Sequence, residues 1–137
     1  MITAIDTSVL LDVLLQDPSF AAKSEEVLRR ASKDGALIIA EVVYAELAGL
    51  FPNQAALDTF LQNTGIQMKS SNLAILWKAG ELWRRFCADR SRHAAIARRI
   101  IADFLIGAHA MVHAEQLLTR DRDFYQKVFA GLRIVHP

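Results

Sequence analysis

The sequence predicts a single α/β domain, a three-layer α/β/α sandwich built around a short, mainly parallel central sheet. Short apolar runs alternate along the chain with longer stretches of helical periodicity, and this alternation is typical of a parallel sheet covered on both faces. No linker, repeat or low-complexity tract divides the 137 residues. We therefore expect one domain over residues 1–137.

Five short apolar segments favour strands. They are residues 2–5, 36–40, 66–69, 116–119 and 132–135. The first of them, ITAI, is rich in β-branched residues, which fit a pleated surface. In sheets of this kind ligands bind beyond the carboxyl ends of the strands, so the residue after each strand deserves inspection.

Helices are expected between these strands. The first follows residue 6 and has Val9, Leu10, Val13 and Leu14 on one face; later ones are expected over residues 41–51, 53–64, 95–114 and 123–131. A helix over residues 17–34 is predicted with Asp17 as its N-cap, Pro18 in its first position and Gly35 as its stop. Another, over residues 70–87, is predicted with a serine cap. Its apolar face would hold Leu73, Leu76, Trp83 and Cys87.

Composition excludes several classes of protein. The chain is 53% hydrophobic and 23% charged, which indicates a folded domain. The single cysteine, Cys87, excludes an internal disulfide and a cysteine-based zinc site and fits a reducing compartment. The N-terminus lacks the pattern of a signal peptide, and no charge-free apolar stretch reaches the roughly 18 residues of a membrane span. We expect a cytoplasmic protein without a membrane segment.

Positive charge is concentrated in one segment. Residues 84–99 hold six arginines and one aspartate, a net +5 that leaves −4 for the rest of a chain whose total is +1. The segment is either an ordinary solvated helix surface or a rim that binds the phosphates of a nucleic acid. The arginines that we expect to contact such phosphates are Arg84, Arg85, Arg98 and Arg99.

Four carboxylates occupy informative positions. Asp6 follows the first strand and Asp121 follows the fourth, while Glu46 and Asp103 lie in apolar helical segments. Taken singly, Asp6 and Asp121 could cap helices. Glu46 and Asp103 could form salt bridges, in the case of Asp103 with Arg99 four residues earlier.

Taken together, the four acids suggest a shared site at one edge of the sheet. Unit charges 4 Å apart repel by roughly 4 kcal/mol at an intermediate dielectric, so four clustered carboxylates need a cation. Mg²⁺ or Mn²⁺ prefers such oxygen ligands. Asp6 is then most simply a metal ligand, with Thr7, Ser8 and Thr119 as supporting hydroxyls. Beside the arginines, such a metal could activate water against a phosphodiester.

Four stretches carry a resemblance to a known family. AIDTSVLLDVLL, IAEVVYAEL, IADFLIGAHA and LLTRDRDF resemble the four motifs of PIN-domain nucleases, in the order of that family and over nearly the whole chain. The short single-domain form is similar to the VapC toxins of bacterial toxin–antitoxin pairs. The resemblance implies Mg²⁺- or Mn²⁺-dependent cleavage of RNA, a homodimer and inhibition by a small VapB-like antitoxin.

The resemblance also assigns residues. Carried over by position, the catalytic and metal-binding acids are Asp6, Glu46, Asp103 and Asp121. Thr119 matches the hydroxyl residue two positions before the fourth acid, and Ser8 stands where the family usually has asparagine or serine. Asp123 is close enough to replace or assist Asp121 as the fourth acid.

Three other functions remain open at this point. A haloacid-dehalogenase-like phosphatase also uses an aspartate after the first strand, but that chemistry requires a second aspartate where this chain has Ser8. A PIN-like module could bind RNA or a protein without cleaving, although all the acids are present. A nuclease of the same fold acting on DNA also fits, because no motif that reads bases is apparent.

Overall fold

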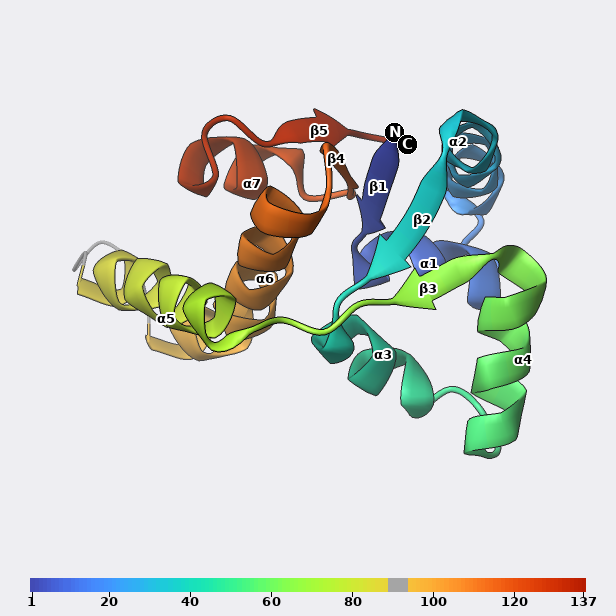
Figure 1. Ribbon diagram of the computed structural model, residues 1–137, viewed down its shortest axis with the longest axis horizontal. Helices are drawn as coiled ribbons and strands as arrows, with labels where there is room; N and C mark the ends of the chain where they lie inside the picture. The colour runs from blue at the N-terminus through green and yellow to red at the C-terminus, as the bar shows by residue number, and fades with distance from the viewer. Residues whose placement is uncertain (89–93) are drawn as a thin grey trace.

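One parallel sheet of five strands forms the centre of the molecule. The computed structural model describes residues 1–88 and 94–137, and of residues 94–100 it gives only the helical backbone. The strands are β1 (Ile2–Ile5), β2 (Ala36–Ile39), β3 (Ile66–Met68), β4 (Gln116–Leu118) and β5 (Arg133–Val135). They lie in the order β3-β2-β1-β4-β5, each parallel to its neighbour (Figure 1). The predicted strands and the α/β class are confirmed.

Helices connect the strands. Within the described residues they are α1 (Thr7–Leu14), α2 (Ala21–Asp34), α3 (Glu41–Ala48), α4 (Gln54–Thr64), α5 (Leu73–Ala88), α6 (Ala94–His113) and α7 (Arg122–Val128). Strands β2 and β3 lie on one side of β1, and β4 and β5 lie on the other. Because crossovers between parallel strands are right-handed, the helices that precede β3 in the chain lie on one face of the sheet and the helices that follow it lie on the other face. Accordingly α2 packs on β2, and α6 packs on β1 and β4 (Figure 1). None of the described helices is long and apolar enough to cross a membrane.

The strands form the middle of the core. Ile5, Ile39, Leu117 and Leu118 are at most 1% exposed, because helices cover both faces of the sheet. Glycine allows two close approaches around this core. A Cβ at Gly35 would collide with the carbonyl oxygen of Met1, and a Cβ at Gly107 would collide with the ring of Phe129. Both positions therefore require a residue without a side chain.

Two predicted helix starts were wrong. Helix α2 begins at Ala21, not near Asp17, because the Asp17 carboxylate accepts hydrogen bonds from the amides of Ser19 and Phe20, both at 2.9 Å, and closes a separate turn. Pro18 therefore lies outside the helix.

The start and the buried face of α5 also differ from the prediction. The residue that caps α5 is Asn72, whose side chain accepts from the Ile75 amide at 2.9 Å, and not a serine. Leu73 is 83% exposed, while Ile75 and Ala79 form the buried face. A helical repeat fixes which residues share a face, but the neighbouring elements decide which face is buried.

Candidate functional site

Asp6 stands at the carboxyl end of β1, beside the end of β4. Because β1 and β4 pair in parallel with Ile5 opposite Leu118, the next residues, Asp6 and Thr119, are brought together. The Thr119 hydroxyl donates to Oδ2 of Asp6 at 2.6 Å, and the Ser8 hydroxyl donates to the same oxygen at 3.2 Å. The register of the sheet thus creates the contact between the first and the fourth sequence motif.

The Asp6 carboxylate is buried without a positive partner among the residues that the structure describes. Asp6 is 5% exposed, and although it precedes α1 its side chain makes no capping hydrogen bond. Burial raises the pKa of Asp6 despite the hydrogen bonds from Thr119 and Ser8, and the charge of Glu46 raises it further. The capping interpretation of Asp6 is therefore wrong, and the carboxylate is held where its charged form is costly.

Glu46 approaches the same edge from α3. Its Oε1 accepts a hydrogen bond from the Thr7 hydroxyl at 3.0 Å, which ties α3 to the first turn of α1. Among the side chains of residues 1–88 and 101–137, no salt bridge to Glu46 is found. Thr7 thus contacts one of the acids, in keeping with the supporting role predicted for it. The alternative interpretation of Glu46, a salt bridge to an arginine, finds no support among the described side chains.

Asp121 and Asp103 lie at the same end of the sheet. The amide of Asp121 donates to the Thr119 hydroxyl at 3.0 Å, so that hydroxyl contacts both Asp6 and the backbone of Asp121. Asp121 precedes α7 without capping it, and it is exposed, as is Asp123 in the first turn of that helix. Asp103 is half-buried on α6, and the side chain of Arg99, its proposed alternative partner, lies outside the described residues.

Tyr125 shows that the four acids share one neighbourhood. This side chain on α7 is fully buried, and its hydroxyl has no hydrogen-bond partner among the described residues. Burial raises the pKa of Tyr125 well above its ordinary value. The negative charges that raise it further belong to Asp6, Asp103, Asp121 and Glu46. Sequence reasoning missed this residue, because a tyrosine between apolar residues resembles an ordinary core aromatic.

The donor set suits a hard divalent cation, since all four acids offer carboxylate oxygens. As they stand, however, no three acidic, histidine or cysteine side chains in the described part of the chain are grouped closely enough to hold a metal ion. The acids therefore fit a cation chemically, and their role as ligands stays a prediction.

The arginine-rich segment is described only in part. Arg84 and Arg85 are exposed on the last turns of α5, and Arg85 forms a salt bridge with Glu81 one turn earlier. The side chains of Arg98 and Arg99 lie outside the described residues. The pairing with Glu81 offsets one of the positive charges expected on this rim.

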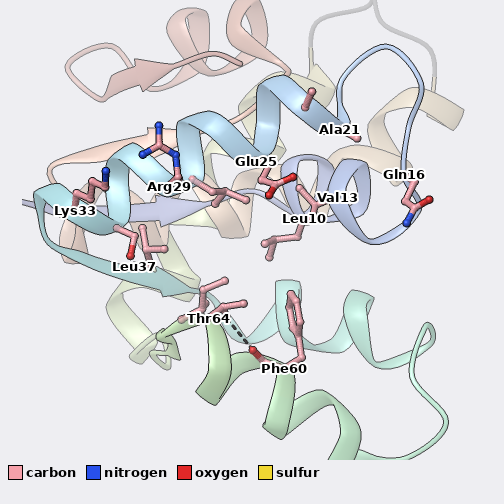
Figure 2. A pocket seen from close by; sticks show the side chains of 14 residues that line it. Leu10, Val13, Gln16, Ala21, Glu25, Arg29, Lys33, Leu37, Phe60 and Thr64 are labelled. Carbon is pink, nitrogen blue, oxygen red and sulfur yellow. Dashed lines mark hydrogen bonds between the residues drawn. The ribbon is translucent and has the colours of Figure 1, made fainter.

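A large groove lies away from the acids. It has a volume of about 900 Å³ and runs between α1, α2 and α4 (Figure 2). Leu10, Leu28 and Phe60 give it an apolar lining, while Arg29 and Lys33 of α2 lie along it. None of the four acids lines it.

The fold and the site define an α/β domain whose conspicuous carboxylates gather at the carboxyl edge of a parallel sheet. The family model described as the PIN domain matches residues 3–130, and the chain therefore belongs to the PIN domain family. The predicted family is confirmed, and the phosphatase alternative loses its basis.

Solved structures show the same fold. A chain in the crystal structure of VapBC2 from Rickettsia felis bound to a DNA fragment from their promoter is 20% identical, with a TM-score of 0.67 over 100% of this chain and 99% of that one. A chain in the structure of VapBC-1 from nontypeable Haemophilus influenzae is 18% identical, with a TM-score of 0.69 over 99% of this chain and 98% of that one. No match was found among curated proteins.

Proposed function

We propose that this protein is a divalent-cation-dependent endoribonuclease, the VapC-type toxin of a toxin–antitoxin pair. The observation that carries the proposal is Asp6, a buried carboxylate that neither caps a helix nor pairs with a described cation, with three further acids nearby. Membership of the PIN family supports nuclease chemistry. The likeness of the fold to chains of two VapBC complexes supports the toxin assignment.

Each site residue has a role in this proposal. Asp6, Glu46, Asp103 and Asp121 hold Mg²⁺ or Mn²⁺, and Asp123 assists or replaces Asp121. Thr119 and Ser8 orient the Asp6 carboxylate through the hydrogen bonds that they donate to it, and Thr7 orients Glu46. When bound, such a cation supplies the Lewis acidity that lets water attack a phosphodiester at neutral pH and offsets charge on the leaving oxygen.

The substrate and partners follow from the surfaces. The arginines at positions 84, 85, 98 and 99 would hold the RNA backbone, because guanidinium groups pair well with phosphates. The apolar groove of Figure 2 would bind an amphipathic segment of a small antitoxin along α2 and α4. We further propose that the protein acts as a homodimer in the bacterial cytoplasm.

The decisive experiment is cleavage of a mixed pool of structured RNA with Mn²⁺, with Mg²⁺ or with EDTA. We expect cleavage by the wild type only with a cation, none by Asp103→Asn, and unchanged activity for Asp34→Asn, which alters an exposed acid on α2.

Three outcomes would contradict the proposal. Full activity of Asp103→Asn would remove Asp103 from the site. Thermal stabilisation by Mn²⁺ without RNA cleavage would indicate a metal site that serves another substrate, such as DNA. Neither cleavage nor a metal effect would favour the alternative function, a PIN-like module that binds RNA or protein without cutting.

A further inference from the structure

The ring of Tyr125 is held firmly in place. Its centroid lies 5.0 Å from that of Phe124 and 6.0 Å from that of Phe129. The amide of Tyr125 donates to the carbonyl of Asp121, one turn earlier. These contacts fix the tyrosine relative to the loop that carries the fourth acid. Its hydroxyl is therefore placed by packing and not by a hydrogen bond of its own.

Such a hydroxyl is costly. A buried polar group without a partner destabilises a fold, and unsatisfied groups of this kind are uncommon in native proteins. Phenylalanine would give the same packing without that cost, and the rings that contact Tyr125 are indeed phenylalanines. The presence of tyrosine among them points to a use for the oxygen atom.

The surroundings of the hydroxyl indicate that use. The charges that act on it are those of the four acids, with Asp6 first. Oδ2 of Asp6 already accepts from Thr119 and Ser8, so the carboxylate has a second oxygen to offer. A neutral phenol is a hydrogen-bond donor, and carboxylates are strong acceptors.

We propose that Tyr125 is a positioning residue of the acid site, whose hydroxyl donates a hydrogen bond to the carboxylate cluster, to Asp6 foremost, when a divalent cation draws the acids together. This inference rests on the proposed cation site and adds to it a buried hydrogen-bond donor, the hydroxyl of Tyr125. The hydroxyl then orients a ligand, as outer hydrogen-bond partners of metal ligands generally do. Because Tyr125 is fully buried, it acts through the carboxylates and does not contact RNA.

The test compares Tyr125→Phe with the wild type, and with Tyr44→Phe as a matched control. Tyr44 donates to Oδ1 of Asp58 at 2.7 Å, in a pair that includes none of the four acids. Mn²⁺ affinity of the metal-stripped proteins is measured by calorimetry, thermal stability in EDTA by circular dichroism, and cleavage as kcat and KM separately.

For Tyr125→Phe we expect metal-free stability equal to or above that of the wild type, Mn²⁺ affinity about ten-fold weaker, and a lower kcat with unchanged KM. Tyr44→Phe should keep the Mn²⁺ affinity and kcat of the wild type. Wild-type Mn²⁺ affinity and kcat in Tyr125→Phe would overturn this inference and leave the proposed function standing. A wild type that binds no Mn²⁺ and cleaves no RNA would overturn both.

Discussion

Two buried aspartates, six residues apart on the β1–α1 segment, have opposite surroundings. Asp12 is 2% exposed, and its carboxylate accepts from Arg120 Nη1 at 2.6 Å and from the Ser24 hydroxyl at 2.7 Å. Asp6 is 5% exposed and accepts hydroxyl hydrogen bonds, while the charge of Glu46 opposes its own. The chain supplies a positive partner for Asp12, whereas the described residues supply none for Asp6.

The difference separates a structural acid from a functional one. The guanidinium of Arg120 lies 3.8 Å from the ring of Phe20, so the pair with Asp12 joins α1, the start of α2 and the β4–α7 loop. That loop also carries Thr119 and Asp121. Asp12 thus stabilises the frame in which the site residues stand. Asp6 is the residue for which we propose a cation from outside the chain.

The largest expected effect comes from breaking the Asp12 pair. Arg120→Met should lower the free energy of unfolding by about 3–5 kcal/mol, because it leaves a buried charge without its partner. Urea denaturation in EDTA measures the loss. The double variant Asp12→Leu with Arg120→Met should recover most of it, because an apolar pair of similar volume carries no desolvation cost. A loss below about 1 kcal/mol would mean that the Ser24 hydroxyl alone satisfies Asp12.

A change at Asp6 should not lower the free energy of unfolding, in contrast to Arg120→Met. In EDTA, Asp6→Asn should be as stable as the wild type or more stable, because burial disfavours the charged carboxylate and raises its pKa. The neutral amide removes a charge that burial disfavours and keeps an oxygen for the Thr119 hydroxyl. The thermal stabilisation by Mn²⁺ should disappear. A destabilised variant that still responds to Mn²⁺ would make Asp6 a structural residue like Asp12.

The smallest expected effect is on the pH dependence of stability without metal. The pKa of Asp6 in the folded protein is raised above the ordinary value of 3.8. Between these two values the native state binds more protons than the unfolded state, so this group's contribution to stability falls as pH rises. Relative to Asp6→Asn, the wild type in EDTA should therefore lose stability as the pH rises above 3.8. If urea denaturation gives the same dependence of unfolding free energy on pH for the wild type and Asp6→Asn, the raised pKa of Asp6 is contradicted.

The sequence predicted the elements well where local chemistry controls them. Asn53 caps α4 by accepting from the Ala56 amide at 2.9 Å, and Gly65 ends that helix with a φ of 72°. The prediction failed where a residue had two local options. Asp17 caps a turn and not α2, and Leu73 points to solvent because the opposite face of α5 packs inward.

The residues of the site also divide into those that the sequence indicated and those that only the structure revealed. The four acids and Thr119 were recognisable from their positions after strands and inside apolar helices. No local pattern indicates that Arg120 pairs with Asp12, which lies 108 residues away, because only the β4–α7 loop and α1 in their final places bring the two together. Nor does any pattern indicate that the hydroxyl of Tyr125 lies near the acids without a partner among the described residues.

The sequence by itself therefore determined the α/β class, the strands and the identity of the conspicuous acids, since these depend on periodicity and on residue type. Tertiary structure alone decided which buried acid receives a countercharge and which does not. The physical reason is that charge compensation depends on distances across the sheet. Those distances are fixed by parallel pairing of β1 with β4, and the local pattern around Asp6 or Asp12 does not contain them.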